Sequence, residues 1–366
     1  MAHDNKLQVY ADMVLNHNSG GEKEKNPNKN NTETWTLFNP KSEKFKRNYE
    51  CFHPSKIHPD DEGRFGDMPD LCHSNLYVKS QLIEYAQWLL NEIGYDGFRF
   101  DFVKGFRGHI VRDIMQLRGH RNGQTIKPFS VGEYWDSNGQ MILDWLDNAN
   151  YGSDNPSGAF DFPLRGKLKD MCDTYGSSLR NLIGHGTLLN DRPSGAVTFV
   201  DNHDTADTSH GGKPIINDKM MAYAFILTHE GYPCVFWKDY FNYNLGEPAF
   251  KSGIAALVRI HEENAGGKTT VLYLDDNLYI MQREGHEGQP GLIFALNNSG
   301  DKWSGASVKT KWNNARFIPG AWRGSNTVDT PEVKWTQADG WGEFSAPPRG
   351  YTVYLPQMSG AGKGYY

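Results

Sequence analysis

Three acidic residues stand near the ends of three separate apolar segments of this sequence: Asp101, Glu133 and Asp204. Carboxylates that converge repel one another, so at least one is expected to have a raised pKa and to act as an acid. That division of labour suits the cleavage of a glycosidic bond, in which one carboxylate attacks and another protonates the leaving oxygen. Retaining enzymes of this kind hold the two groups about 5–5.5 Å apart, a distance that neighbouring strands can supply.

The segment around Asp101 contains the clearest pattern. Apolar Phe98, Phe100 and Phe102 alternate with Arg99 and Asp101. Because side chains two residues apart share a face of a strand, the charged pair is expected to lie together. A neighbouring guanidinium keeps a carboxylate ionised, as a nucleophile or a cation stabiliser requires. The alternative is a structural ion pair that lines a barrel.

A regular alternation of strands and helices must position these groups. A helical pattern from Leu76 to Ile93 precedes the Asp101 strand, and Gly94 is well placed to end it, which is typical of a parallel sheet. The strands that we expect are Leu7–His17, Gly97–Gly105, Pro128–Trp135, Gly158–Leu164, Ala196–Asp204 and Pro233–Trp237. The later helices are Phe106–Leu117, Ser137–Ala149 capped by Ser137, one that reaches about Ile183, Met220–His229 and Phe250–Glu263. In a (β/α)₈ barrel, catalytic residues come from the carboxyl ends of several strands, where His17 and His203 are also expected.

Two regions depart from this alternation. Residues 18–75 are polar and rich in Asn, Lys and Gly, which indicates an inserted, loop-rich subdomain. From Lys268 onward, short alternating runs between turn residues indicate an antiparallel β domain. We therefore expect a partial barrel in 1–267, a β domain in 268–358 and a tail in 359–366. The β-domain tryptophans could fill its core, which we favour, or form a sugar-contacting surface.

Composition excludes several classes of protein. The 366 residues carry a net charge of −6, which gives no basic footprint for nucleic acid. No apolar run approaches the roughly 20 residues of a membrane span, and no apolar signal segment is visible at the start of this sequence. The four cysteines are too few for a disulfide framework, and buried free thiols are expected at Cys172 and Cys234.

Four motifs in order carry a resemblance to a known family. They are Asp12…Asn16-His17, Gly97-Phe-Arg-Phe-Asp101, Gly132-Glu133 and Phe199-Val-Asp-Asn-His-Asp204. Their order, spacing and flanking residues resemble the four sequence regions of the α-amylase family of glycoside hydrolases. The resemblance runs from about residue 7 to the β domain. Phe160-Asp-Phe-Pro and the stretch Cys51–Cys72 resemble the archaeal and plant-like α-amylases in particular.

The resemblance implies a role for each matching residue. Asp101 would be the nucleophile, Glu133 the general acid and base, and Asp204 the residue that stabilises the distorted sugar. Arg99 would orient Asp101. The remaining sugar contacts would come from His17, Lys104 and His203.

The resemblance also implies a calcium site. Its ligands would be the side chains of Asn16, Asp61 and Asp70 and the carbonyls of Gly63 and Gly105, oxygen donors of the kind that calcium prefers. The alternative is a set of acidic residues exposed on a loop. A second candidate metal site consists of His53, His58 and Cys72. These nitrogen and sulfur ligands, with a fourth ligand, would suit Zn²⁺.

The expected architecture is therefore a (β/α)₈ TIM barrel that lacks its first two βα units, because the sequence opens at what resembles the third strand. A loop-rich insertion follows the first strand present, and a C-terminal antiparallel β-sandwich completes the chain. The expected parent is a secreted, monomeric α-amylase that hydrolyses internal α-1,4-glucosidic bonds of starch, glycogen or malto-oligosaccharides with retention, and this segment alone would be poorly active. The alternatives are a transglycosylase, a malto-oligosaccharide-specific relative and a non-catalytic carbohydrate-binding fragment.

Overall fold

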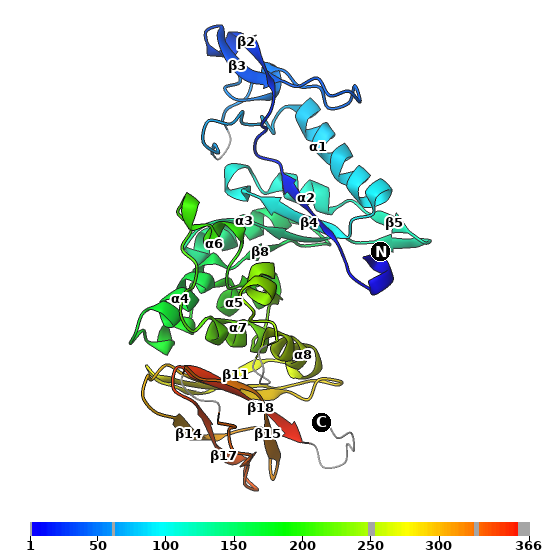
Figure 1. Cartoon of the computed structure of the whole chain (residues 1–366). Coiled ribbons are helices and arrows are strands. Elements are labelled where there is room, and N and C mark those ends of the chain that lie inside the picture. The colour runs from blue at the N-terminus through cyan, green and yellow to red at the C-terminus, as the bar shows by residue number, and fades with distance from the viewer. Residues whose placement is uncertain (1, 61–62, 248–252, 326–328, 358–366) are drawn as a thin grey trace. The chain divides into compact units, whose positions relative to one another are not determined.

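The computed structural model describes the chain except for residues 1, 61–62, 248–252, 326–328 and 358–366 (Figure 1). Internal contacts divide the chain into two units, Met1–Phe162 and Pro163–Tyr366, and each is described by itself. The predicted tail 359–366 lies outside the described residues.

Four short parallel strands form the sheet of the first unit (Figure 1). In spatial order they are β1 (Tyr10–Val14), β4 (Gly97–Asp101), β7 (Phe129–Gly132) and β8 (Gly158–Phe160). Each lies within a segment that the sequence predicts to be extended. On β4 the predicted alternation is confirmed, since Phe98 and Phe100 are buried whereas Arg99 and Asp101 are half-buried.

Three helices follow the strands of this unit: α1 (Leu76–Trp88), α2 (His109–Met115) and α3 (Gly139–Asn150). The first continues as a π-helix, Leu89–Ile93, and ends at Gly94 as predicted, where a φ of 88° suits a residue without a Cβ. The cap of α3 differs from the prediction. The side chain of Asn138, rather than that of Ser137, accepts the hydrogen bond from the free backbone N–H of Gln140.

The inserted region contains more regular structure than its sequence suggests. Strands β2 (Glu22–Asn26) and β3 (Thr32–Leu37) form an antiparallel hairpin. The end of the region returns to the sheet, because the backbone of residues 69–71 pairs with that of residues 16–18, through Leu71 N–H to Asn16 O at 2.9 Å and Asn18 N–H to Pro69 O at 3.0 Å. A second hairpin that the sequence analysis missed is formed by β5 (Gly119–Arg121) and β6 (Gln124–Ile126).

The βα alternation continues into the second unit. Its parallel strands are β9 (Ala196–Phe199) and β10 (Tyr232–Cys234). Its helices are α4 (Phe162–Asp173, which starts at the last residue of the first unit), α5 (Leu188–Asp191), α6 (His203–Ala206), α7 (Lys219–Thr228) and α8 (Ile254–Asn264). The helix predicted to reach Ile183 stops at Asp173, a short 3-10 helix follows, and α5 was not predicted. The predicted start of the last helix, Phe250, lies outside the described residues.

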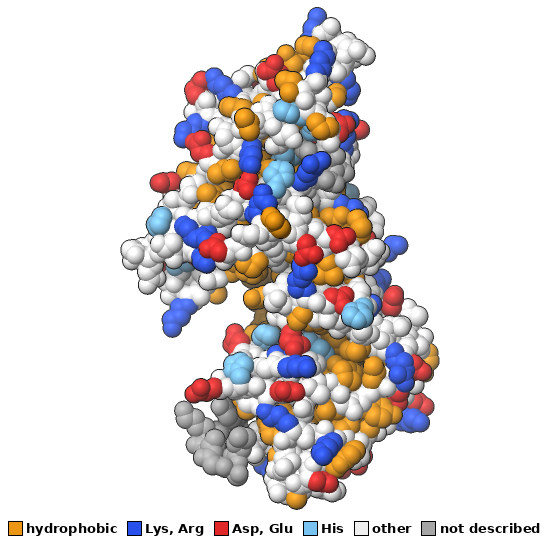
Figure 2. Space-filling view, turned by 180° about the vertical axis from the view of Figure 1, so that it is seen from behind, with side chains coloured by type: hydrophobic (Ala, Val, Ile, Leu, Met, Phe, Trp, Pro, Cys, Tyr) orange, Lys and Arg blue, Asp and Glu red, His pale blue; other side chains and the backbone are white. Residues whose placement is uncertain are grey.

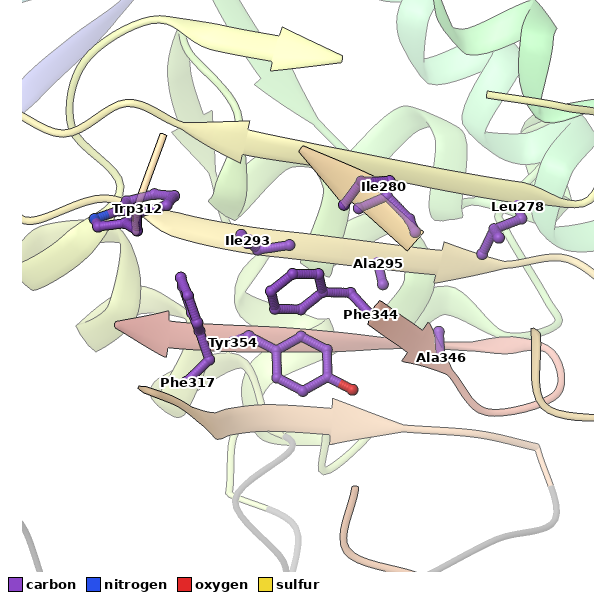
Figure 3. Packing of buried hydrophobic residues seen from close by; sticks show 10 residues of the cluster. Leu278, Ile280, Ile293, Ala295, Trp312, Phe317, Phe344, Ala346 and Tyr354 are labelled. Carbon is purple, nitrogen blue, oxygen red and sulfur yellow. The ribbon is translucent and has the colours of Figure 1, made fainter. Parts of the chain in front are cut away.

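The β region forms two antiparallel sheets. The larger has the order β11 (Thr269–Leu274), β12 (Leu278–Arg283), β13 (Leu292–Asn297), β18 (Gly350–Gln357), β15 (Arg316–Arg323) and β16 (Lys334–Trp335), and the smaller pairs β14 (Ser304–Lys309) with β17 (Trp341–Ala346). Side chains from both sheets meet in one core, where Ile293, Phe344 and Tyr354 pack together (Figure 3). Trp312 lies in this core as favoured, whereas Trp335 and Trp341 are exposed. The antiparallel prediction is confirmed, and no helix occurs in its described residues.

Helix α7 and the residues that flank it contact the β region of the second unit. Nine of the ten residues of the helix, Met220 to Thr228, are buried. His229, just beyond its end, shares a hydrogen bond of 2.9 Å with the hydroxyl of Tyr279 on β12. Arg349, just before β18, donates to Asp218 at the start of α7 at 2.8 Å and also to the carbonyl oxygen of Cys172. The predicted division near residue 268 therefore marks a change of secondary structure inside this unit.

The surface shown in Figure 2 carries charges of both signs, and the cysteines form no disulfides. On the face shown in Figure 2, Lys and Arg side chains are interspersed with Asp and Glu side chains. Among the residues that the structure describes, no helix is long and apolar enough to span a membrane. All four cysteines are free, as predicted for Cys172 and Cys234. Cys172 is buried as expected, whereas Cys234 is exposed, so the prediction of a buried thiol is wrong there.

Candidate active site

One guanidinium group lies at the centre of the candidate site in the first unit. Arg99 Nη1 donates to Asp12 Oδ1 at 2.7 Å and to Asp101 Oδ1 at 2.5 Å, and its Nη2 lies 2.8 Å from Glu133 Oε1. Asp12 is on β1, Asp101 on β4, and Glu133 follows β7. Arg99 therefore joins carboxylates that come from three adjacent strands.

The backbone at the ends of β4 and β7 brings Asp101 and Glu133 to the same edge. Glu133 N–H donates to Phe100 O at 2.8 Å and Val103 N–H donates to Glu133 O at 3.1 Å, so the ladder continues past the assigned strands. Phe102 has a φ of 43°, which turns the chain directly after Asp101. Its N–H also donates to Glu133 Oε2 at 3.3 Å, which adds a second restraint on that carboxylate.

The glycine before Glu133 allows a close helix. A Cβ built on Gly132 would lie 2.3 Å from the ring of Trp145 on α3, so only glycine fits between the strand and this ring. A substitution there would push β7 away from α3, and the position of Glu133 would change with it.

Burial and charge keep the central guanidinium ionised. The side chain of Arg99 is 15% exposed and that of Glu133 is 7% exposed. Burial by itself lowers the pKa of Arg99, but the charges of Glu133, Asp12 and Asp101 outweigh it and raise this pKa above its usual range. The site is a partly buried cluster of one cation and three acids.

His17 belongs to the same neighbourhood. It lies three residues beyond β1, is buried, and stacks on Phe65 with ring centres 4.6 Å apart and ring planes 7° apart. Burial lowers the pKa of His17, and the charge of Asp101 partly offsets this effect. His17 therefore stays neutral at neutral pH, beside the predicted nucleophile.

Lys104 has a partner that the sequence analysis missed. Its Nζ donates to Asp136 Oδ2 at 2.7 Å and lies 5.6 Å from the centre of the Tyr134 ring. The hydrogen bond to Asp136 raises the pKa of Lys104. The spacing of Asp136, three residues after Glu133, was the only available signal for this pairing. Asp12 was named only within a motif, and its role as an Arg99 partner follows from the register of β1 on β4.

The last predicted residues, His203 and Asp204, belong to the second unit. The sequence analysis expected them to close a strand, but β9 ends at Phe199 and both residues lie in the first turn of α6, after the N-cap Asn202. Their side chains are 63% and 48% exposed, and His203 Nε2 lies 3.4 Å from Asp204 Oδ2. Because the two units are described separately, the meeting of Asp204 with Asp101 and Glu133 stays a prediction.

Part of the predicted calcium site has the chemistry of a metal ligand set. Asn16 is fully buried, and neither its Oδ1 nor its Nδ2 has a hydrogen-bond partner. A Cβ built on Gly105 would lie 2.2 Å from Asn16 Oδ1, so the Gly105 backbone lies against this amide. Asp70 is buried too, on the segment that pairs with residues 16–18. A Cβ built on Gly63 would meet no atom within 4 Å, so this residue lies in open space, and Asp61 lies outside the described residues.

The predicted zinc trio is not brought together. Among the described residues, which include His53, His58 and Cys72, no three or more His, Cys, Asp or Glu side chains are close enough to hold a metal ion. Cys72 is fully buried and its backbone N–H donates to Cys51 O at 2.9 Å, whereas His53 Nδ1 lies 3.1 Å from Asp60 Oδ1. Spacing along a loop does not determine where its side chains point, and the described arrangement gives the zinc prediction no support.

Comparison with known proteins extends over nearly the whole chain. The family model described as "Alpha-amylase C-terminal" matches residues 292–355. The α-amylase of Geobacillus stearothermophilus is 30% identical over 415 residues, which cover 98% of this chain and 72% of that protein. The glucan 1,4-α-maltohexaosidase of Bacillus sp. strain 707 is 29% identical over 409 residues, which cover 96% of this chain and 75% of that protein. The chloroplastic α-amylase 3 of Arabidopsis thaliana is 32% identical over 280 residues, which cover 69% of this chain and 28% of that protein.

Solved structures share the fold. An α-amylase from Geobacillus thermoleovorans, crystallised with acarbose, superposes with a TM-score of 0.68 at 21% identity and covers 98% of this chain and 79% of its own. A cyclomaltodextrin glucanotransferase with a three-domain ABC distribution has the same TM-score and identity. The match covers 98% of this chain and 77% of that protein. The sequence relatives decide the family: this chain belongs to the α-amylase family and is an α-amylase-type glycoside hydrolase.

Proposed function

We propose that this protein hydrolyses α-1,4-glucosidic bonds of starch-like glucans with retention of configuration, and that Asp101, Glu133 and Asp204 carry the reaction. The observation that carries the proposal is the contact of one guanidinium with both Asp101 and Glu133. Two carboxylates held by neighbouring nitrogens of one Arg99 side chain lie close together, and close carboxylates favour a double displacement rather than inversion.

Asp101 is the nucleophile in this proposal. Its Oδ1 is bound to Arg99, which leaves the second oxygen for attack on the anomeric carbon. The carboxylate is 21% exposed at the end of β4, so a sugar ring can reach it. The bond from its oxygen to the anomeric carbon forms as the bond to the leaving oxygen breaks, which gives a glycosyl ester.

Glu133 transfers the proton. In this proposal its carboxyl group is the general acid that protonates the departing oxygen. In the second step the resulting carboxylate takes a proton from the water that attacks the ester, and both residues return to their starting states.

Asp204 is proposed to bind sugar hydroxyls and to stabilise the positive charge that develops on the ring. Its exposed side chain on α6 leaves its oxygens accessible to a substrate. The sequence motif Phe199–Asp204 supports the assignment. Substrate contacts are proposed for His17, as a neutral imidazole, and for Lys104 and His203.

We further propose that calcium binds through Asn16, Asp70 and Gly105, with Asp61 and Gly63 as the remaining predicted ligands. The unpartnered buried oxygen of Asn16 and the close approach of the Gly105 backbone support this set. A bound cation would supply the missing partner of that amide and would hold the end of the inserted region against β1. The expected (β/α)₈ barrel and secretion remain predictions; one of the named relatives is a chloroplastic α-amylase.

The test is the replacement of Glu133 and Asp101 in turn. Glu133→Gln and Asp101→Asn should each lower kcat on malto-oligosaccharides by about 1,000-fold or more, because each removes the group that moves a proton or forms the ester. Glu92→Gln, an exposed residue after α1, is the control and should retain full activity. Turnover that is unchanged in Glu133→Gln, or a first product with inverted configuration by NMR, would contradict the mechanism.

Product length separates the narrower alternatives. The maltohexaosidase relative raises a malto-oligosaccharide-specific activity as the second candidate. An endo-acting hydrolase releases a range of products from starch, whereas a maltohexaose-forming enzyme releases mainly one and a transglycosylase lengthens short acceptors. Chromatography of products from soluble starch at early times distinguishes the three.

A further inference from the structure

A buried carboxylate stands directly before the motif that contains Asp204. Asp201 follows β9, and its side chain has no exposed area. Its Oδ1 accepts hydrogen bonds from Arg165 Nη2 at 2.6 Å and Thr205 Oγ1 at 2.8 Å. Its Oδ2 accepts from Ile215 N–H at 3.1 Å and lies 2.9 Å from Lys219 Nζ. Each oxygen therefore has two donors, and this fixes the carboxylate in the fold.

The two cations reach other parts of the second unit. Arg165, on α4, also donates to Val200 O at 3.2 Å and to the carbonyl oxygen of Lys213. Lys219, the first residue of α7, also donates to Asp239 Oδ1 at 2.7 Å. Asp239 is buried as completely as Asp201. Two cations and two anions thus form a neutral buried network, whose members sit on α4, the end of β9, α7 and the segment after β10.

Thr205 transmits this restraint to the neighbouring residue. Its Oγ1 accepts from Asn202 N–H at 2.9 Å, and Asn202 Oδ1 accepts from Thr205 N–H at 2.8 Å, so the two residues close a capping box around α6. Asp204 lies inside this box. Its own carboxylate is exposed and, within the described part of the chain, lies near the adjacent His203, so its position depends on the backbone of α6.

A second contact restrains the same backbone. A Cβ built on Gly212 would lie 2.2 Å from Asp204 O, so residue 212 packs directly on the carbonyl of Asp204. The segment that contains Gly212 is in turn held by Arg165 at Lys213 and by Asp201 at Ile215. The same carboxylate therefore acts on Asp204 from both sides, through Thr205 and through the 212–215 segment.

We propose that Asp201 is a positioning residue for Asp204: its buried carboxylate, paired with Arg165 and Lys219, fixes the backbone of α6 so that the Asp204 side chain is presented to the sugar in one orientation. This inference rests on the proposed role of Asp204 in the reaction. Asp201 itself touches neither substrate nor reacting atoms, since its side chain is fully enclosed.

Asp239 offers a matched control. Asp201→Asn and Asp239→Asn each remove one buried negative charge next to Lys219, so a general loss of stability should be similar in both. Only Asp201 contacts Thr205 and Ile215. We expect Asp201→Asn to lower kcat per folded molecule by about 100-fold, the scale of a misplaced catalytic group, whereas Asp239→Asn keeps kcat within about 3-fold. Similar losses of kcat in both variants would overturn the proposal.

Thr205 provides a milder pair of variants for the case in which Asp201→Asn does not fold. Thr205→Val deletes the hydroxyl that joins Asp201 to the capping box, and Thr205→Ser retains it. Thr205→Val should lower kcat more than it changes KM, and Thr205→Ser should restore most of the loss. Equal activity of the two variants would contradict the transmission of the restraint through this hydroxyl.

Hydrogen exchange separates this inference from the proposed function. Amides of residues 202–206 should exchange at least about 10-fold faster in Asp201→Asn than in Asp239→Asn, because Thr205 N–H and Ala206 N–H are protected by bonds within the capping box. Equal exchange in the two variants would refute the positioning role even if the enzyme is active. Full turnover in Glu133→Gln would refute the proposed mechanism while leaving the exchange result intact.

Discussion

At the scale of single residues, the candidate site depends on how Arg99 distributes its donors. A planar guanidinium can bind several carboxylates at once because its N–H groups point in fixed directions. Arg99 uses Nη1 for Asp12 and Asp101 and Nη2 for Glu133. The most exposed of these partners is Asp12, at 59%, so the arm toward Asp12 contributes least to the buried cluster.

Replacement of Arg99 tests this distribution. Arg99→Met leaves Asp101 and Glu133 close together without a cation, which should lower kcat/KM by about 100-fold or more and destabilise the protein by about 3–5 kcal/mol, the cost of breaking a buried pair. Arg99→Lys should recover only part of the activity, because one ammonium cannot span three acids. Steady-state kinetics and thermal unfolding measure both effects.

Asp12→Asn is the control for the Arg99 variants, because it removes only the exposed arm. We expect its kcat/KM to fall by less than about 3-fold. A loss as large as that of Arg99→Met would show that the site depends on Asp12 as much as on the two buried contacts.

At the scale of elements, α7 connects the βα region of the second unit to the β sheets. His229 at its end is fully buried, stacks on Phe225 at 3.8 Å between ring centres and shares a hydrogen bond with Tyr279. Burial lowers the pKa of His229 to about 4, an effect that the hydrogen bond to Phe225 O partly offsets. The packing between α7 and β12 therefore favours the neutral form of the His229 imidazole.

This junction predicts an acid sensitivity. In the unfolded chain His229 takes up a proton near pH 6.5, whereas the folded protein resists it until about pH 4. The unfolded state binds more protons in that window, so the free energy of unfolding should fall as the pH drops from about 6.5 to 4, by about 3 kcal/mol from this residue alone.

Calorimetric melting at a series of pH values measures this effect, and His229→Gln should lose about one proton of uptake on unfolding between pH 6.5 and 4.5. His261, whose pKa burial also lowers, stays in place in that variant and accounts for part of the remaining slope. An identical pH dependence in the variant and the original protein would rule out His229 as the source.

At the scale of the whole molecule, the polar region 18–75 is the part that most needs an additional restraint. It includes one short hairpin and returns to β1 through backbone bonds at residues 16–18. The fully buried amide of Asn16, without a partner, lies at that return. A cation bound there would stabilise the folded protein only, because the unfolded chain does not gather these ligands.

Removal of calcium should therefore lower the thermal midpoint of the whole protein. With free calcium at about 100 times its Kd, binding contributes about 2.7 kcal/mol, which corresponds to a shift of several degrees for a protein of this size. Melting with added calcium and with excess chelator measures the shift. In Asn16→Ala the two melting curves should coincide, and coincident curves for the unaltered protein would exclude the site.

The sequence by itself determined most of the strands and helices of the βα region and the family of this protein. Alternation marked β4 and paired Arg99 with Asp101, and Gly94 marked the end of the preceding helix, because periodicity and backbone strain are local properties. The four ordered motifs pointed to the α-amylase family, to which the comparisons assign the chain. The hairpin of β5 and β6, and the cap at Asn138, were missed because weak local signals do not separate them from neighbouring turns.

Only the tertiary structure decided which side chains meet. The register of β1 on β4 brought Asp12 to Arg99, and the register of β7 on β4 brought Glu133 to the same guanidinium. The enclosure of Asp201 by Arg165 and Lys219 joins segments separated by many residues, and the trio His53, His58 and Cys72 did not assemble. Contacts of this kind depend on packing between distant segments, and spacing along the chain contains no information about that packing.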